Sequence, residues 1–292
     1  MTAVAALIRS LRIDQWLKNS VVFAALVFSR NFTDVDLIEL NIIVFVVFCL
    51  SSSAVYLIND VIDYSRDCHH PEKKQRPIAS GKLSRSTAVI VAILLGGVSI
   101  AISAVAFDLL TLLTVISFII LNVIYSLLLK NIVIVDVMSI AGSFVLRAVG
   151  GGFAIGVPIS SWLVVCTILL ALFLGFGKRR HELKSLEKIA PEHRRSLEHY
   201  STYFLDQMIS VVTASTVVAY TFYTISPEVE DKLGVKHLEL SIPFVLYGIF
   251  RYLYLIHRQD KGGSPSRILY TDIPILLNVL LWLATVLILM RI

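Results

Sequence analysis

The chain has 292 residues, of which 57% are hydrophobic and only 16% are charged, and its mean hydropathy is +0.80. These values exclude an ordinary soluble globular domain and indicate a protein that crosses a membrane several times. The net charge is +5, and the positions of the charged residues along the chain are more informative than this total. The lipid bilayer is therefore an expected partner, and nucleic acid is not.

Apolar runs predict an all-α, polytopic membrane bundle of about nine transmembrane helices, because each span needs about 20 mostly apolar residues. The predicted helices lie near residues 16–30, 37–66, 86–106, 109–129, 133–153, 160–178, 203–225, 240–257 and 271–290. No Gly/Ser-rich linker divides them, so residues 1–292 are predicted to form a single transmembrane domain. No signal-peptide cleavage site follows the first apolar run, so we expect that span to be retained.

The loops predict the orientation. Lys and Arg are concentrated in the loops 66–85, 178–195 and 258–267, whereas the alternate loops around 31–39 and 226–239 carry more acids. By the positive-inside rule the N-terminus is cytoplasmic. The expected location is therefore the inner (plasma) membrane, with the active site facing the cytoplasm.

An acidic motif follows the second predicted helix. If the helix continues through it, Asn59, Asp63 and Asp67 fall at i, i+4 and i+8 on one face, about 6 Å apart along the axis. Asp60 lies about 100° round from Asn59, where it could support this face. Acids at the mouth of a membrane helix are costly without a cation, and Mg2+ is the hard ion that carboxylates and phosphate oxygens share.

The loop after the motif carries Lys73 and Arg76, which we expect to neutralise the oxygens of a diphosphate. The alternative is a charged loop that serves only to fix the topology. That alternative does not explain the acids, because an orientation signal has no use for them.

Two further groups of polar residues lie at predicted cytoplasmic helix ends. Tyr125 and Lys130 could donate a hydrogen bond and a charge to a phosphate, or could form an interfacial anchor pair. Lys178 and Arg179, followed by Arg180, could clamp an anionic group, or could mark the cytoplasmic end of the sixth helix.

Two cations lie in or beside predicted spans. Arg147 is in the middle of a helix, where an Arg usually faces a cavity or an acid. It either binds substrate or pairs with Asp136 or another acid of the bundle. Lys18 lies at the cytoplasmic mouth of the first helix, where we expect it to contact substrate.

These residues resemble the UbiA superfamily of intramembrane prenyltransferases, and within it the decaprenyl-phosphate phosphoribosyltransferase branch. The matching segments are residues 15–19, 59–77, 125–130, 146–148 and 177–183. The last third of the chain matches only in hydropathy.

The resemblance implies a UbiA-like bundle with Mg2+ held by Asn59, Asp63 and Asp67. It implies transfer of 5-phosphoribose from phosphoribosyl diphosphate (PRPP) to a polyprenyl phosphate of the decaprenyl type. Diphosphate would be released, and the product would serve the synthesis of cell-envelope glycan precursors. The sequence leaves a homo-oligomer open.

Two other classes of protein remain. A UbiA-type enzyme that prenylates an aromatic acceptor would usually carry a second Asp-x-x-x-Asp motif. The sixth predicted helix instead ends in Lys-Arg-Arg-His-Glu, and the Tyr125 to Lys130 spacing is one residue longer than in those enzymes. A transporter would place ionisable residues near the midplane of several helices, and Arg147 is the one clear case in the sequence.

Overall fold

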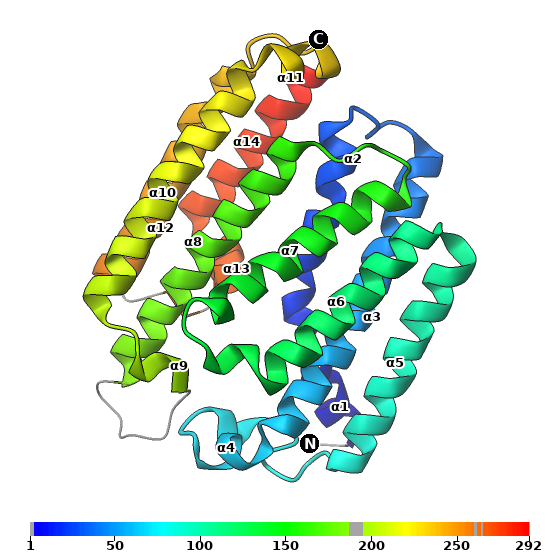
Figure 1. Cartoon of the computed structure of the whole chain (residues 1–292), viewed down its shortest axis with the longest axis vertical. Coiled ribbons are helices and arrows are strands. Elements are labelled where there is room, and N and C mark those ends of the chain that lie inside the picture. The colour runs from blue at the N-terminus through cyan, green and yellow to red at the C-terminus, as the bar shows by residue number, and fades with distance from the viewer. Residues whose placement is uncertain (1–2, 187–194, 260–261, 264, 292) are drawn as a thin grey trace.

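The computed structural model describes residues 3–186, 195–259, 262–263 and 265–291, and within these ranges it contains helices and loops but no strand (Figure 1). This confirms the predicted all-α class. The longer helices are α3 (Val35–Ile62), α5 (Arg85–Ala106), α6 (Leu109–Leu127), α7 (Val135–Ala154), α8 (Ser161–Leu186), α10 (Thr202–Ile225), α12 (Ile242–Arg258) and α14 (Ile273–Arg291). The shorter ones are α1 (Ala3–Leu11), η1 (Ile13–Phe23), α2 (Ala24–Phe28), α4 (Tyr64–His69), η2 (Lys73–Gln75), η3 (Leu129–Asn131), α9 (Arg195–Glu198), α11 (Pro227–Leu233), η4 (Leu238–Ser241) and α13 (Pro265–Thr271).

Eight helices of the described ranges are long and apolar enough to cross a membrane, and they match eight of the nine predicted spans in order. The predicted first span, 16–30, is different, because this stretch forms the 3-10 helix η1 and then the short helix α2. Neither piece reaches the roughly 20 residues that a single span requires. The polar residues Lys18 and Asn19 fall inside the predicted run, and η1 packs against α3 and α7.

The acidic motif lies across a break between two helices. The predicted helix 37–66 ends at Ile62, and Asp63 joins α3 to α4 with φ −84° and ψ 3°. Two backbone bonds nevertheless cross the break, from Asp63 N to Asn59 O at 2.9 Å and from Asp67 N to Asp63 O at 2.8 Å. They keep the backbone spacing of four residues across the break, but the side chains differ in their partners, since Asp63 contacts Lys130 and Asp67 contacts Arg76.

Helix α3 is central to the N-terminal half, where it packs against α5, α6, α7 and η1, while α8 packs between α7 and α10 (Figure 1). The C-terminal part of the chain also contacts η1. The Ser266 hydroxyl of α13 donates a hydrogen bond to Gln15 Oε1 at 3.3 Å. Segment η1 is therefore held by α3, α7 and α13 together.

A cavity of about 410 Å3 lies at the end of the bundle opposite α4, among α2, α8 and α10 (Figure 1). Its walls are mostly apolar and aromatic, and include Phe28, Trp162, Tyr220 and Tyr223. None of the residues predicted for the functional site lines this cavity.

A close approach between η1 and α7 depends on Gly151. A Cβ atom at this position would lie 2.0 Å from the Val22 carbonyl oxygen, so the two backbones would have to separate. We expect Gly151→Ala to destabilise the protein by about 1–3 kcal/mol, the usual cost of overpacking. A lower thermal unfolding midpoint in detergent measures this effect. Gly97→Ala in α5 is the control, because nothing lies within 4 Å of its added methyl group. Equal unfolding midpoints for the two variants would contradict the argument.

Candidate active site

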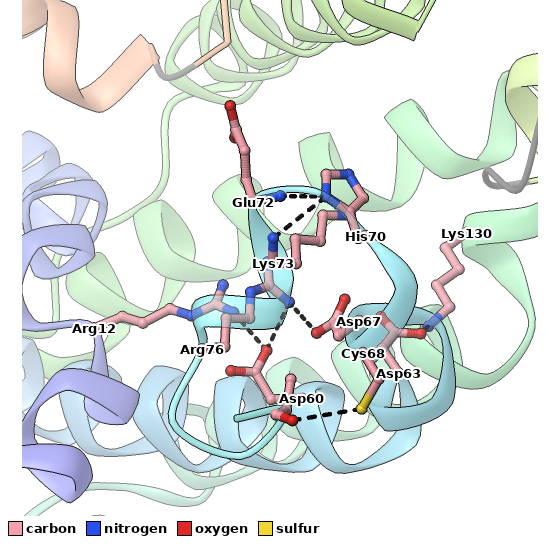
Figure 2. Close-up of polar contacts among 11 residues, drawn as sticks. Arg12, Asp60, Asp63, Asp67, Cys68, His70, Glu72, Lys73, Arg76 and Lys130 are labelled. Atoms are coloured by element: carbon pink, nitrogen blue, oxygen red, sulfur yellow. Dashed lines mark hydrogen bonds and ion pairs between the residues drawn. The ribbon is translucent and has the colours of Figure 1, made fainter. Parts of the chain in front are cut away.

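The four polar residues of the acidic motif lie at the end of α3, at its junction with α4 and in α4. Figure 2 shows the three acids, Asp60, Asp63 and Asp67. Asp60 faces inward from the last turn of α3 and is 2% exposed, and Asp67 in α4 is also buried. Asp63 lies at the junction and is partly exposed. Asn59 makes no side-chain hydrogen bond within the described ranges, so its amide oxygen has no competing protein donor there.

Two arginines connect the buried acids. Arg76 Nη1 lies 3.0 Å from Asp60 Oδ1 and 2.6 Å from Asp67 Oδ2, so one guanidinium group bridges both carboxylates (Figure 2). Arg12 Nη2 lies 2.5 Å from the same oxygen of Asp60. The Arg12 guanidinium also lies over the ring of Tyr56, 5.0 Å from its centre. The sequence predicted Arg76 beside the acids, but it did not reveal Arg12, which lies between α1 and η1.

A lysine from another part of the chain completes the cluster. Lys130 Nζ lies 2.5 Å from Asp63 Oδ1, and the Lys130 side chain is almost fully buried (Figure 2). Lys130 belongs to η3, in the loop between α6 and α7. The sequence left Lys130 either as a phosphate ligand or as part of an interfacial anchor pair, and it did not predict this contact with a carboxylate of the acidic motif.

The three acids are matched by three cations, Arg12, Arg76 and Lys130. Burial raises the pKa of Asp67, and the neighbouring Arg76 and Lys73 oppose this rise. The cluster is therefore close to neutral, and its carboxylates are not available as a bare anionic pocket. A diphosphate that enters would compete with the carboxylates for these cations, and an added metal ion would restore the balance of charge.

The donor set suits Mg2+ when a substrate supplies further ligands. No group of three or more His, Cys, Asp or Glu side chains in the described ranges is arranged to hold a metal ion. Asp63 and Asp67 offer two carboxylates and Asn59 an amide oxygen. Mg2+ usually takes one or two carboxylates together with phosphate oxygens and water. The residues therefore fit a metal ion that is bound jointly with a diphosphate.

A second cluster lies at the ends of α6, α7 and α8. Arg179 Nε lies 2.6 Å from Asp136 Oδ2, Arg179 Nη1 pairs with Glu182, and Arg179 Nη2 donates to the Tyr125 hydroxyl at 3.2 Å. Arg179 is buried, and all three of its nitrogens have protein partners. Lys178 differs, because its side chain is 39% exposed and lies 3.7 Å from Glu182.

Arg147 and Lys18 occupy the interior beside η1. Arg147 Nε donates to Asn19 Oδ1 at 2.6 Å, Nη1 donates to Ser143 at 3.1 Å, and its guanidinium lies 4.6 Å from the centre of the Phe118 ring. Within the described ranges no carboxylate pairs with it. The alternative that it pairs with Asp136 is wrong, since Asp136 binds Arg179 instead. Lys18 is partly buried on η1, close enough to Arg147 for the two charges to repel.

The comparisons with known proteins agree with this architecture. A model of the UbiA prenyltransferase family matches residues 20–271. The chain is 32% identical over 281 residues to the decaprenyl-phosphate phosphoribosyltransferase of Corynebacterium glutamicum, covering 94% of this chain and 84% of that relative. It is 32% identical over 289 residues to the Mycobacterium tuberculosis protein of the same name, covering 97% and 93%.

The fold is also similar to that of a UbiA homologue from Archaeoglobus fulgidus bound to GPP and Mg2+. The TM-score is 0.72 at 17% identity, and the match covers 98% of this chain and 100% of that one. The protein is thus a multi-pass membrane transferase. It belongs to the UbiA prenyltransferase family.

The bridge made by Arg76 yields a stability prediction. Arg76→Met would leave Asp67 without its guanidinium partner and Asp60 with Arg12 alone. We expect a loss of about 2 kcal/mol at neutral pH, because a buried charge would remain uncompensated. Lys74→Met on the exposed surface of the same loop is the control and should have little effect.

The same variant has a predictable pH dependence. The Asp67 pKa, already raised by burial, rises further when Arg76 is absent. The penalty is therefore present above that raised pKa and disappears as the pH falls through it towards the unfolded value of about 3.9. Unfolding midpoints of wild type and variant should converge as the pH is lowered. A gap that stays constant or widens would contradict this account.

Proposed function

We propose that this protein transfers 5-phosphoribose from PRPP to a polyprenyl phosphate and releases diphosphate. The observation that carries the proposal is the similarity, over 94% of the chain, to a relative named for that activity. The local chemistry supports it, because α8 carries Lys178, Arg179 and Arg180 in place of a second acidic pair. Arg179 pairs with Asp136 and Arg180 with Asp206, so Lys178 is the most exposed of the three. A donor with an additional phosphate needs cations there.

The donor diphosphate would bind at the acidic cluster. Asp63 and Asp67, assisted by Asn59, would hold Mg2+, which when bound would supply positive charge to the diphosphate oxygens. Lys73 and Arg76 on the following loop would share the negative charge that develops as the diphosphate leaves. Asp60 would keep Arg76 in place through their 3.0 Å contact.

The reaction would need little proton transfer. The bond from C1 of the ribose to the diphosphate oxygen breaks as C1 gains oxocarbenium character, and a phosphate oxygen of the lipid forms the new bond from the opposite face. A single displacement therefore inverts C1. Since the attacking phosphate is already anionic at neutral pH, no strong protein base is required, and catalysis rests on positioning and electrostatics.

The 5-phosphate of the donor would need a separate set of cations. Lys130 would contribute from its place on Asp63, and Lys178 is the most exposed of the three consecutive cations in the last part of α8. Arg179 would contribute positive charge without contacting the phosphate, since its N–H groups already bind Tyr125, Asp136 and Glu182. Lys18 and Arg147 would contribute positive potential from the interior, where the lipid phosphate would approach.

The site would face the cytoplasm of the plasma membrane, with the N-terminus on the same side. The acidic cluster, the end of α8 and the N-terminal end of the chain lie at one end of the bundle (Figure 1). Lys and Arg are concentrated in the loops at this end. PRPP and Mg2+ are available in that compartment, and the product would enter the synthesis of cell-envelope glycan precursors.

A second candidate is transfer of a prenyl group from prenyl diphosphate to an aromatic acceptor. It is favoured by the shared fold with a homologue bound to GPP and Mg2+. This function would use the same acidic cluster for the prenyl diphosphate. It gives no role to the basic end of α8, and we therefore rank it second.

One assay separates the two functions. The purified protein in detergent or vesicles would be incubated with Mg2+, radiolabelled PRPP and polyprenyl phosphate, and the organic phase would be analysed. We expect labelled phosphoribosyl lipid with Mg2+ and none after chelation. A parallel reaction with prenyl diphosphate and an aromatic acceptor should give no product. Prenyl transfer without phosphoribosyl transfer would reverse the ranking.

Substitution of the carboxylates tests their role. We expect Asp63→Ala and Asp67→Ala each to lower the transfer rate by roughly 100-fold or more, because each removes a ligand of the diphosphate-bound ion. Asp36→Ala is the matched control, since Asp36 is exposed in the first turn of α3, at the other end of the same helix. Full activity in the first two variants, with folding verified, would remove the acidic cluster from the mechanism.

A further inference from the structure

The loop between α6 and α7 contains a strained turn. Ile134 has φ 68° and ψ −48°, and Val135 N donates to Val133 O at 2.8 Å across it. This is a γ-turn of the rare kind with positive φ, which is unfavourable for a β-branched residue. Such a turn persists when the surrounding structure holds it. The same loop carries Lys130, whose amino group lies on Asp63.

Tyr200 holds this turn from both sides. Its hydroxyl accepts a hydrogen bond from Ile134 N at 2.7 Å and donates one to Asp136 Oδ1 at 2.8 Å. Burial, and then the neighbouring Asp136 carboxylate, raise the pKa of Tyr200. The hydroxyl therefore keeps its proton at neutral pH and remains a donor. The other oxygen of Asp136 binds Arg179, so the carboxylate itself is fixed.

Ser196 holds the beginning of the loop. Its hydroxyl donates to the backbone oxygen of Lys130 at 3.0 Å, and Ser196 is fully buried. Ser196 and Tyr200 are four residues apart, in and just after the short helix α9, which contacts η3 (Figure 1). The segment 196–200 therefore touches the loop at the backbone of Lys130, at the strained turn and at Asp136.

We propose that Ser196 and Tyr200 are positioning residues that deliver Lys130 to Asp63 and so set the affinity for the phosphorylated donor. Lysine has a long flexible side chain, and a short contact between two side chains 67 residues apart requires a fixed backbone at Lys130. The part of this inference that concerns donor affinity rests on the proposed function, in which Lys130 and Asp63 contact the donor.

The position of Lys130 can be tested without any activity. In the wild type the Lys130 side chain is 3% exposed, and its amine should react slowly with a water-soluble amine-acylating reagent. We expect Tyr200→Phe and, separately, Ser196→Ala to increase the labelling rate of Lys130 about tenfold. The folded protein is labelled first, and the modified peptide is then quantified by mass spectrometry after digestion. An unchanged rate in both variants would overturn the proposal.

Two control variants separate positioning from general loosening. Tyr203→Phe makes the same chemical change on a side chain that is 75% exposed, and it should leave Lys130 protected. Ser201→Ala removes the N-cap of α10, where the hydroxyl accepts from Phe204 N at 3.1 Å, and weakens the helix without touching the loop. Equal labelling of Lys130 in Ser201→Ala and Tyr200→Phe would show that lost stability, rather than positioning, exposes the amine.

The kinetic arm uses a double-mutant cycle. We expect Tyr200→Phe to raise KM for PRPP about tenfold while KM for the lipid phosphate stays unchanged. In a Lys130→Met background, Tyr200→Phe should cause no further rise in KM for PRPP. Additive effects would mean that Tyr200 does not act through Lys130. If Lys130 becomes exposed as expected but no variant or wild type transfers phosphoribose, the proposed function falls and the positioning of Lys130 stands.

Discussion

The structure depends on the neutralisation of carboxylates at the mouth of a membrane bundle. Four acids lie close to the ends of α3, α4 and α7, where an isolated negative charge would be costly. Each is paired at short range with a cation from another segment: Arg12 and Arg76 for Asp60, Arg76 for Asp67, Lys130 for Asp63, and Arg179 for Asp136. These pairs tie η1, the loop after α4, the loop after α6 and the end of α8 to one another, so the requirement for charge balance also defines the tertiary arrangement of the site.

The same pairs explain how the site could accept and release charged molecules. Arg76 and Lys130 are held by carboxylates rather than by backbone oxygens. A phosphate could therefore take the place of a carboxylate without leaving either cation unpaired. Arg179 serves a different purpose. It is buried among Asp136, Glu182 and Tyr125, and it fixes the helix ends against which the more exposed Lys178 lies.

Within the residues that the structure describes, the buried charge of Arg147 is stabilised in a different way, by neutral groups rather than by a carboxylate. Its charge is spread over the Asn19 amide, the Ser143 hydroxyl and the faces of Phe118 and Phe144. Hydrogen bonds to neutral groups and cation–π contacts lower the cost of a buried guanidinium, and they leave a net positive potential beside η1. The sequence left Asp136 or another acid of the bundle as a possible partner, and Asp136 lies in the same helix as Arg147. Helical geometry separates them by 11 residues, roughly three turns, so they cannot meet within one helix.

The sequence by itself determined the all-α membrane class, eight of the spans and the chemical character of the acidic motif, because hydropathy and helical spacing are local properties. It also indicated that Arg76 lies beside the acids, on the loop that follows them, but it did not predict that Lys130 contacts Asp63. The break at Asp63, the 3-10 form of η1, the arrival of Arg12 on Asp60 and the contacts of Ser196 and Tyr200 with the α6–α7 loop were decided by the tertiary structure. The contacts of Arg12, Ser196 and Tyr200 join segments that are distant in the chain, and the packing of helices, rather than any local pattern, selects which polar groups meet.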